Sequence, residues 1–280
     1  INEETSGVFK AGYGMGDAYP EAEDYIKAYI RSNTIQKYVE LVRNAKSRLT
    51  IPVIASVNCF SGGEWVSFAR QLEEAGADAL ELNVFILPVN EFKESAEVEN
   101  VYFEIVKSIK SQIKIPVSVK ISHYFTNLSA FVDKIKAYGA NATTLFNRFY
   151  EPDININTLE MGAASVFSTA AELRTTLRWT GILAGKDKRL EISASTGVHG
   201  GEAAVKLLLA GATTVQVCSV LYEKGIHVIE DINNFIGKWM DSKAFKTIED
   251  YRGMLSYSSI ENPDLYERAQ FMKYFSNKQY

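Results

Sequence analysis

Hydrogen-bonding side chains stand at the ends of several short apolar runs in this sequence, and one of them is a lysine. Lys120 follows Val117 and Val119 in a run whose side chains should be buried on both faces. Burying an ammonium is costly unless the charge is paired, so a lysine at this place needs an explanation. Two kinds of chemistry fit: an ammonium opposite a developing anion, or an amine that forms a Schiff base with a carbonyl substrate. A structural ion pair is the alternative to both.

Five other apolar runs also end in polar residues. An asparagine after a strand is usually a turn former, so a single one of these residues does not indicate a site. Together they do predict one, because catalytic residues of strand–helix repeats gather at the carboxyl ends of the strands. In chain order, the residues are Asn58, Asn83, Asn147 with Arg148, Ser195 with Thr196, and Ser219.

Two turns predict a phosphate site. Residues 196–201, with the sequence TGVHGG, end one predicted strand and open a helix, whose first N–H groups are free to bind an anion. Cys218 and Ser219 end the next predicted strand. Barrels often bind phosphate with the loops after their seventh and eighth strands. If two strands are missing before the first predicted strand of this chain, these two turns are the loops after the seventh and eighth strands.

Other chemistry has little support in the sequence. The histidines His123, His199 and His227 are scattered without matching carboxylates, so no metal site is expected, although His123 could line the pocket. No G-x-S-x-G elbow or Walker loop occurs, which leaves hydrolase and P-loop functions unsupported. Cys59 fits a small buried hydrophobic residue better than a nucleophile.

The elements that would position these residues alternate between strand and helix. Three predicted helices end at a Gly-Ala pair, beginning at Gly76, Gly139 and Gly211, where a positive φ suits glycine. Apolar residues recur at helical spacing between the strands. The predicted strands are 51–57, 79–84, 116–121, 143–147, 189–194 and 214–219, and the predicted helices are 35–47, 61–74, 96–113, 128–138, 172–183 and 201–209.

This alternation predicts an α/β fold with a parallel sheet, either open and doubly wound or closed into a barrel. We favour a (β/α)8 TIM barrel. A complete barrel needs eight strands, so we expect the first two to be missing from this chain. We further expect one domain over residues 1–280, a long loop over residues 1–30, and a C-terminal extension over residues 245–280 that packs on the barrel's outside or on a partner subunit.

The composition predicts a globular protein whose partners are small molecules or copies of itself. Its 280 residues are 46% hydrophobic and 23% charged, which excludes disordered and low-complexity chains. The formal net charge of -4 leaves no basic surface for nucleic acid or an anionic membrane. No apolar run reaches the roughly 20 residues of a membrane span, and two cysteines suit a reducing, cytoplasmic location.

Five stretches of the chain carry a family resemblance: IPVIASVNCFSGGEWVSFARQLEEAGADALELNV, IPVSVKIS, TLFNRFYEPDI, ELRTTLRW and SASTGVHGGEAAVKLLLAGATTVQVCSVL. They resemble the dihydroorotate dehydrogenase family of FMN-dependent barrels, in particular its dihydroorotate dehydrogenase-like branch. Their order and spacing, with the GADALELN and LLLAGA signatures, make the resemblance specific. An Ala-Ser-Gly segment and a Lys-Ser pair of that family fall in the part expected to be missing.

The resemblance implies an FMN-dependent oxidoreductase of pyrimidine metabolism that acts on CH–CH groups as a homodimer. Lys120 matches the lysine beside the flavin pyrimidine edge, and Asn83 and Asn147 match asparagines that hydrogen-bond flavin or substrate. Thr169, Thr196 and Cys218 stand where glycine is usual. The remaining implied cofactor contacts are Ser168, Ser195, Gly197 and Ser219.

The sequence departs from the family just after Asn83. At the position of the family's Cys or Ser base stands Ile86, and Pro88 replaces an asparagine that follows it. Isoleucine cannot accept a proton, and a positioned general base contributes roughly 100- to 10,000-fold to the rate. This argues against oxidation of dihydroorotate by the usual route. Arg148 could clamp a substrate carboxylate through two parallel hydrogen bonds, or form a surface or interface salt bridge.

Three hypotheses follow. The first is an FMN-dependent oxidoreductase that passes a hydride between the flavin and a small cyclic or anionic substrate. The second is a phosphate-binding barrel lyase or aldolase that uses Lys120 as its Schiff-base amine. The third is a non-catalytic relative that still binds flavin or phosphate, suggested by Ile86 and the replaced glycines.

Overall fold

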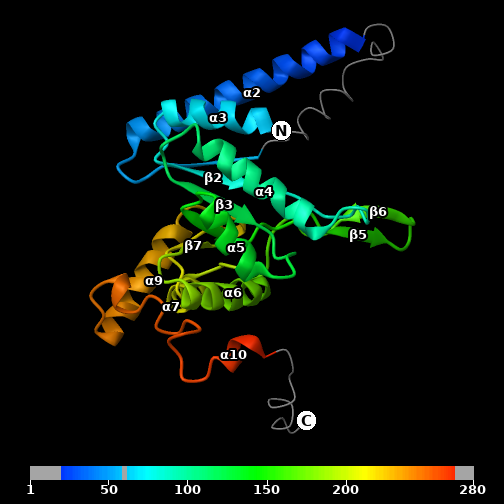
Figure 1. Ribbon diagram of the computed structural model, residues 1–280. Helices are drawn as coiled ribbons and strands as arrows, with labels where there is room; N and C mark the ends of the chain where they lie inside the picture. Colours follow the sequence, from blue (N-terminus) through cyan, green and yellow to red (C-terminus); the bar gives the residue numbers. More distant parts are fainter. Residues whose placement is uncertain (1–19, 59–61, 269–280) are drawn as a thin grey trace. The chain divides into compact units, whose positions relative to one another are not determined.

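The computed structural model describes the backbone of residues 20–58 and 62–268 (Figure 1). The chain forms two compact units, Ile1–Glu81 with Lys107–Pro116 and Leu82–Val106 with Val117–Tyr280. The boundary between the units crosses strand β2 (Ala79–Asn83) and helix α4 (Ser95–Lys110) and does not fall in a linker. The expected single domain stays a prediction.

Helix α2 is joined to the two strands of the first unit by polar contacts. The Tyr38 hydroxyl donates to the carbonyl of Ser56 at 2.9 Å. The Lys46 ammonium donates to Asp78 at 2.8 Å, and the same carboxylate accepts the backbone N–H of Val53 at 2.6 Å. The elements of this unit are α2 (Pro20–Arg48), β1 (Ile54–Val57), α3 (Gly62–Glu74), the first residues of β2 and the end of α4.

Helix α2 is longer than the sequence predicts. The apolar pattern predicts a loop to residue 30 and a helix from residue 35, whereas the helix begins at Pro20. The rest of the predicted loop, residues 1–19, lies outside the described residues. The overlooked signal is local: a proline in the first helical position followed by acidic residues is typical of a helix N-terminus, even without apolar periodicity.

The second unit is built around a parallel sheet. Its strands are hydrogen-bonded in chain order, from the end of β2 through β3 (Val117–Ile121), β4 (Ala142–Leu145) and β7 (Glu191–Ala194) to β8 (Thr214–Val215). Lys120 of β3 lies opposite Thr144 of β4, which in turn lies opposite Ser193 of β7. The apolar side chains of these strands are buried, as the nearly continuous apolar runs predict.

Helices follow the strands. Four of them match a predicted range to within three residues at each end, and the helices after residue 218 were not predicted. Gly139 and Gly211, after α5 and α7, have φ values of 112° and 116°, a region that L-residues with a Cβ rarely adopt. The helices are α4, α5 (Leu128–Ala137), α6 (Leu173–Lys186), α7 (Gly201–Ala210), α8 (Ser219–Lys224) and α9 (Val228–Lys243).

The predicted alternation is confirmed. A strand overlaps each of the predicted ranges, although β4 begins one residue before its range and β8 has only two residues. The parallel sheet with alternating helices fits the α/β architecture of the TIM-barrel type. None of the helices within the described residues is long and apolar enough to cross a membrane.

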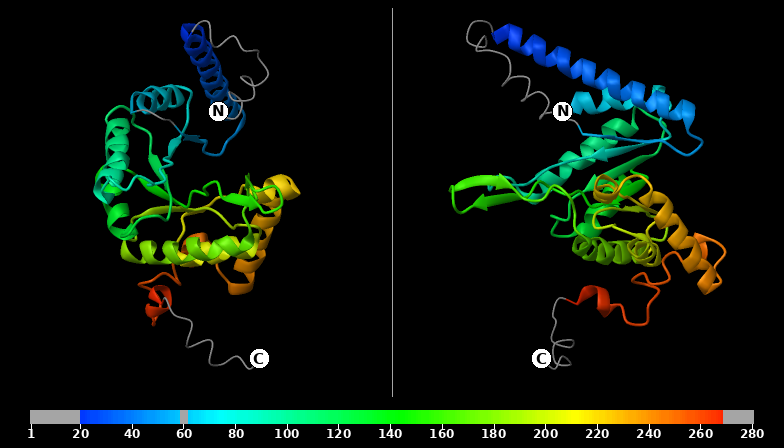
Figure 2. Two further views of the ribbon diagram at one scale, coloured as in Figure 1. Left: turned by 90° about the vertical axis from the view of Figure 1, so that its right-hand side faces the viewer. Right: turned by 180° about the vertical axis from the view of Figure 1, so that it is seen from behind.

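A β-hairpin was not expected from the sequence. Strands β5 (Pro152–Asn155) and β6 (Glu160–Ala163) pair antiparallel and project from the second unit (Figures 1 and 2). Both strands are exposed along their whole length. They are short and poor in β-branched residues, so propensity gives no signal for them.

The C-terminal segment packs on the second unit through its backbone. The N–H groups of Gly253 and Leu255 donate to the last carbonyls of α7, and that of Tyr257 donates to the Gly181 carbonyl of α6 at 2.9 Å. A Cβ on Gly185 of α6 would lie 2.7 Å from the backbone nitrogen of Ser258, so this contact is close. The segment contains η2 (Ile248–Asp250) and α10 (Asp264–Glu267). Residues 269–280 of the predicted extension lie outside the described residues.

Candidate functional site

A pocket of about 220 Å³ opens at the carboxyl ends of β3, β4, β7 and β8. Most of the residues that the sequence singles out line this one space, whereas Asn83 and Thr169 are not among the lining residues. The lining residues are Lys120, Phe146, Asn147, Arg148, Val166, Ser168, Ser195, Thr196, Gly197, Val198, Gln216, Cys218 and Ser219.

Lys120 reaches the pocket from the end of β3 and is half-buried. Its ammonium donates to the side-chain carbonyl of Gln216, which follows β8, at 3.2 Å. Sequence reasoning missed Gln216, although a polar residue within the apolar run of residues 214–218 is the same kind of signal as Lys120. The pair places one positive charge and one amide on the pocket wall.

Asn83 and Asn147 meet at the ends of β2 and β4. The side-chain amide of Asn147 donates to the side-chain carbonyl of Asn83, and both residues are half-buried. The backbone N–H of Asn147 is held by the carbonyl of Ile121 at 2.8 Å. Because each amide has a second polar end, the pair can still bind a ligand.

The predicted phosphate turn has the expected backbone. Gly197 has a φ of 77°, and a Cβ there would lie 2.2 Å from the backbone nitrogen of Leu173 at the start of α6. Thr196 is also left-handed, with a φ of 79°, and its hydroxyl donates to the carbonyl of Phe146 at 3.1 Å. No side chain caps the N-terminus of α7 at Gly200, which leaves its first N–H groups to bind an anion.

Hydroxyl groups line the wall next to this turn. The backbone N–H and the hydroxyl of Ser168 both donate to the Ser219 hydroxyl oxygen, at 2.9 and 3.1 Å. Ser168 Oγ also lies 3.2 Å from His199 Nε2. Thr169, beside Ser168, is exposed, and its backbone N–H donates to Glu172, so it does not line the pocket. Cys218 is an exposed free thiol on the pocket rim.

Arg148 is engaged within the protein. Its guanidinium donates to Glu172 at 3.0 Å, to the carbonyl of Val166 at 3.1 Å and to Glu151 at 3.2 Å. These bonds join the two ends of the segment that carries the β5–β6 hairpin. The structure therefore gives Arg148 a role in holding the pocket wall, and the predicted clamp on a substrate carboxylate stays a prediction.

Aromatic residues lie next to Ile86, in the loop after β2. Ile86 is half-buried, and its backbone bonds to Tyr102, whose pKa burial raises to about 12. The centre of the Phe85 ring lies 4.1 Å from that of the Phe149 ring, which in turn lies 5.4 Å from the centre of the Tyr124 ring. Glu91, Lys93 and Glu94, in the loop after Ile86, are exposed and do not line the pocket.

His123 contacts two aromatic rings, and one of them belongs to a residue that lines the pocket. Its ring lies 4.4 Å from that of Tyr124 and 5.8 Å from that of Phe146, and Phe146 lines the pocket. Burial lowers the pKa of His123, which keeps the imidazole neutral at neutral pH. The sequence allowed His123 a place in the pocket lining, whereas in the structure its side chain is exposed and it is not among the lining residues.

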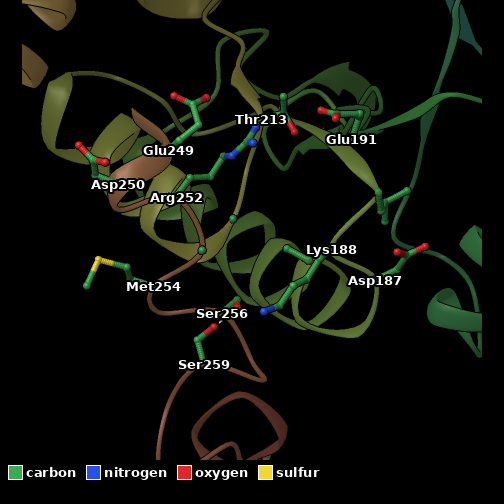
Figure 3. Close-up of a pocket in the computed structure, with 14 residues that line it drawn as sticks. Asp187, Lys188, Glu191, Thr213, Glu249, Asp250, Arg252, Met254, Ser256 and Ser259 are labelled. Carbon is green, nitrogen blue, oxygen red and sulfur yellow. Dashed lines mark hydrogen bonds between the residues drawn. The ribbon is translucent and has the colours of Figure 1, made fainter. Parts of the chain in front are cut away.

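A larger pocket, of about 420 Å³, lies at the other ends of the strands (Figure 3). Glu191 and Thr213 come from the starts of β7 and β8, and Arg252 of the C-terminal segment extends toward Thr213. In barrels this face serves stability, and the carboxyl ends of the strands carry the chemistry. We therefore place the site in the smaller pocket. Within the described ranges, no group of His, Cys, Asp and Glu could hold a metal ion.

Comparison with known proteins agrees with this geometry. The family model described as Dihydroorotate dehydrogenase matches residues 29–240. The chain belongs to this family. The chain is 30% identical to the catalytic subunit of dihydroorotate dehydrogenase B (NAD(+)) of Thermoplasma acidophilum over 249 residues, which cover 87% of this chain and 81% of that protein. The corresponding subunit of Thermoplasma volcanium is 27% identical over 264 residues, with 87% and 83% covered.

Two of the residues that the resemblance marks as departures from the family line the pocket, namely Thr196 and Cys218. Ile86 lies in the loop after β2 and is not among the lining residues. Its place at the family's base position stays a prediction.

Proposed function

We propose that this chain is an FMN-dependent oxidoreductase that passes a hydride between the flavin and a small cyclic or anionic substrate. The observation that carries the proposal is the set of donors around one pocket: a lysine ammonium with amide and hydroxyl groups. Helix α7, whose N-terminus no side chain caps, begins at Gly201, three residues after the lining residue Val198. A phosphorylated, electron-accepting ring needs donors of these kinds. Membership in the dihydroorotate dehydrogenase family supports the same cofactor.

The chemistry of these donors fits FMN. When bound, FMN would supply the hydride transfer. Lys120 would place its charge beside the ring, where it stabilises an anion. Asn83 and Asn147 would use the free ends of their amides to orient ring or substrate. The turn around Gly197, the hydroxyl of Ser219 and the N-terminus of α7 would bind the phosphate.

Ile86 limits which substrate the site can use. Its hydrocarbon side chain accepts no proton, so dihydroorotate oxidation by the family's route would lose a factor of roughly 100 to 10,000 in rate. The rings of Phe85, Phe149 and Tyr124 lie near this loop and favour a flat, weakly polar molecule. We therefore propose a small cyclic substrate other than dihydroorotate.

The test is a visible absorption spectrum of the full-length protein as purified, followed by acid release and identification of the flavin. We expect the two visible bands of oxidised flavin and FMN in the released fraction. A colourless protein that takes up no added FMN would overturn the proposal. In that case borohydride trapping of aldehydes and ketones on Lys120 would test the lyase alternative.

A second candidate is a flavoprotein that binds FMN and carries out no turnover, which Ile86 favours. The two candidates differ in one measurement. An anaerobic screen of cyclic metabolites that bleaches the flavin, followed by its reoxidation, shows turnover. A flavin that no member of a broad panel reduces would favour the non-catalytic protein.

We also propose a homodimer, and the β5–β6 hairpin supports it. Ile154 lies opposite Met161 and Pro152 opposite Ala163, so one face of the hairpin is entirely apolar. Ile154 and Met161 are 61% and 69% exposed, and an isolated two-stranded hairpin is marginally stable in water. A second copy of the chain would cover this face.

Light scattering after size-exclusion chromatography tests the dimer. We expect a dimer for the protein and a monomer for the double variant Ile154→Asp with Met161→Asp. The control is Asn155→Asp, which adds a charge to the polar face of the same hairpin and should leave the dimer intact. A monomeric parent protein, or a dimer that survives the double variant, would contradict the proposal.

A further inference from the structure

The larger pocket, of about 420 Å³, lies where the C-terminal segment crosses the ends of α6 and α7. Gly211, after α7, and Gly253 of the C-terminal segment are both left-handed, with φ values of 116° and 73°. A Cβ on Gly211 would lie 2.5 Å from the Cβ of Ala184 on α6 and 3.6 Å from the Cα of Gly253. The two glycines therefore allow three backbones to meet. The pocket beside them has the volume of a small-molecule site, which is typically about 300 to 1,000 Å³.

Two of the acidic side chains that line this pocket already have partners within the protein. The Asp187 carboxylate is paired with Lys136 and accepts the backbone N–H of Arg189 at 2.9 Å, and these bonds lower its pKa to about 2. The Asp250 carboxylate accepts two backbone N–H groups of the turn before it, both at 2.8 Å. These two carboxylates hold the walls of the pocket and are not left for a ligand.

Three other charged groups of the lining have no such partner. Within the described residues, the guanidinium of Arg252 and the carboxylates of Glu191 and Glu249 form neither a hydrogen bond nor an ion pair. Arg252 is half-buried, and the two glutamates are exposed. In the view of Figure 3 the guanidinium lies between Glu249 on one side and Glu191 on the other.

This set of charges determines which ligand fits. A guanidinium presents its N–H groups in a planar fork that matches the two oxygens of a carboxylate. A simple anion bound there would be repelled by the two glutamates, and a simple cation would be repelled by Arg252. A molecule with a carboxylate and an ammonium on neighbouring atoms is attracted by both kinds of group. An α-amino acid has this arrangement.

The rest of the lining fits the side chain of such a molecule. Leu190 is buried and Met254 is 49% exposed, and both contribute apolar atoms to the pocket. The other cation of the lining, Lys188, is exposed and extends toward Ser256, not toward Arg252, in the view of Figure 3. The charged groups and the apolar groups therefore lie in one space of sufficient volume.

We propose that this pocket binds a free α-amino acid, with its carboxylate on Arg252, its ammonium on Glu249 and Glu191, and an apolar side chain against Leu190 and Met254. The site is separate from the proposed flavin site, because the two pockets lie at opposite ends of β7 and β8. This face of a barrel carries no chemistry, so the amino acid is bound and not converted.

The test is isothermal titration calorimetry of the full-length protein with each of the standard amino acids. The tightest binder is then compared with two analogues: its des-amino acid, which lacks the ammonium, and its amide, which lacks the carboxylate charge. The key variants are Arg252→Met and Glu249→Gln. Their matched controls are Arg174→Met on α6 and Glu261→Gln on the C-terminal segment, both exposed residues outside the pocket lining. Circular dichroism checks that each variant is folded.

We expect an amino acid with a large apolar side chain to bind, and to lose about tenfold in affinity when its carboxylate charge is removed. Arg252→Met should weaken the amino acid about tenfold and leave the affinity of the amide unchanged. Glu249→Gln should weaken the amino acid about threefold, because an exposed carboxylate contributes less, and leave the des-amino acid unchanged. Both controls should bind like the parent protein.

The comparison of analogues on the parent protein needs no variant, so the proposal stays testable even where Arg252→Met does not fold. It is overturned when none of the amino acids binds. A des-amino acid that binds as tightly as the amino acid would show a simple anion site and also overturn it, as would unchanged affinity in Arg252→Met. The visible flavin spectrum is independent of all these results, so the proposed function fails or holds separately.

Discussion

Arg148 provides the most direct test of how the pocket wall is held. Its three hydrogen bonds, to Glu172, to the carbonyl of Val166 and to Glu151, fasten both ends of the segment over residues 149–167. That segment carries the β5–β6 hairpin and leads to Ser168 in the pocket. Replacing Arg148 with methionine keeps most of the apolar stem and removes all three bonds.

The free energy that each bond of Arg148 contributes follows from how exposed the bonded side chains are. Arg148 and Glu172 are 19% and 29% exposed, so their ion pair contributes about 1 to 2 kcal/mol. The bond to the Val166 carbonyl adds about 1 kcal/mol, and the pair with Glu151, which is 58% exposed, adds little. The total of about 2 to 3 kcal/mol corresponds to roughly 30- to 150-fold in the equilibrium for local opening.

Hydrogen exchange measured by mass spectrometry is the assay. In Arg148→Met, peptides within residues 150–167 should exchange faster by about that factor, while peptides of α5 keep their rates. Arg174→Met, which removes an exposed arginine of α6, is the matched control. Unchanged exchange in residues 150–167 would refute the reasoning, and a change confined to substrate KM would favour the carboxylate clamp.

Three further predictions concern single residues. Gly197→Ala should lower the free energy of unfolding in urea by at least about 3 kcal/mol, because the residue is left-handed and its Cβ would meet the start of α6. The control Gly200→Ala should cost less than about 1 kcal/mol, because a Cβ there would have no atom within 4 Å. Equal stabilities of the two variants would contradict this prediction. Lys120→Met should weaken FMN binding about tenfold in fluorescence titrations, because an ammonium beside the ring is lost, and an unchanged Kd would argue against its place in the site. Hydrogen bonding to Lys136 lowers the pKa of Asp187 to about 2, so this carboxylate stabilises the fold above about pH 4 and loses that contribution as the pH falls through about 2. Asp187→Asn should therefore cost about 1 kcal/mol at pH 7, a cost that shrinks between pH 4 and pH 2, and a cost independent of pH would show that charge is not its cause.

Several features of this protein could be predicted from the sequence because they depend on local patterns. Continuous apolar runs predicted the strands, and Gly139 and Gly211 marked helix ends through their backbone freedom. Lys120 stood out because a charge within an apolar run is costly wherever the run is buried. Since parallel strands align their carboxyl ends, the residues that end them were expected to meet, and most of them line one pocket.

Other features were decided by contacts between residues far apart in the chain. Gln216 is 96 positions from Lys120, and only the sheet brings the two together. The chain from His199 through Ser168 to Ser219 joins three loops, each of which has an ordinary sequence. The C-terminal segment binds α6 and α7 mainly through backbone groups, which every residue has, and the close approach at Gly185 becomes evident only once the two segments are seen together.

There is a physical reason why some features could be predicted from the sequence and others required the tertiary structure. Periodicity and backbone preference act over a few neighbouring residues, so the sequence determined where strands and helices lie and which of their ends are polar. Hydrogen-bond direction, burial and charge pairing depend on which loops meet above the strands. Tertiary structure therefore decided that Arg148 holds the wall, that Thr169 faces solvent, and that His199 contacts Ser168.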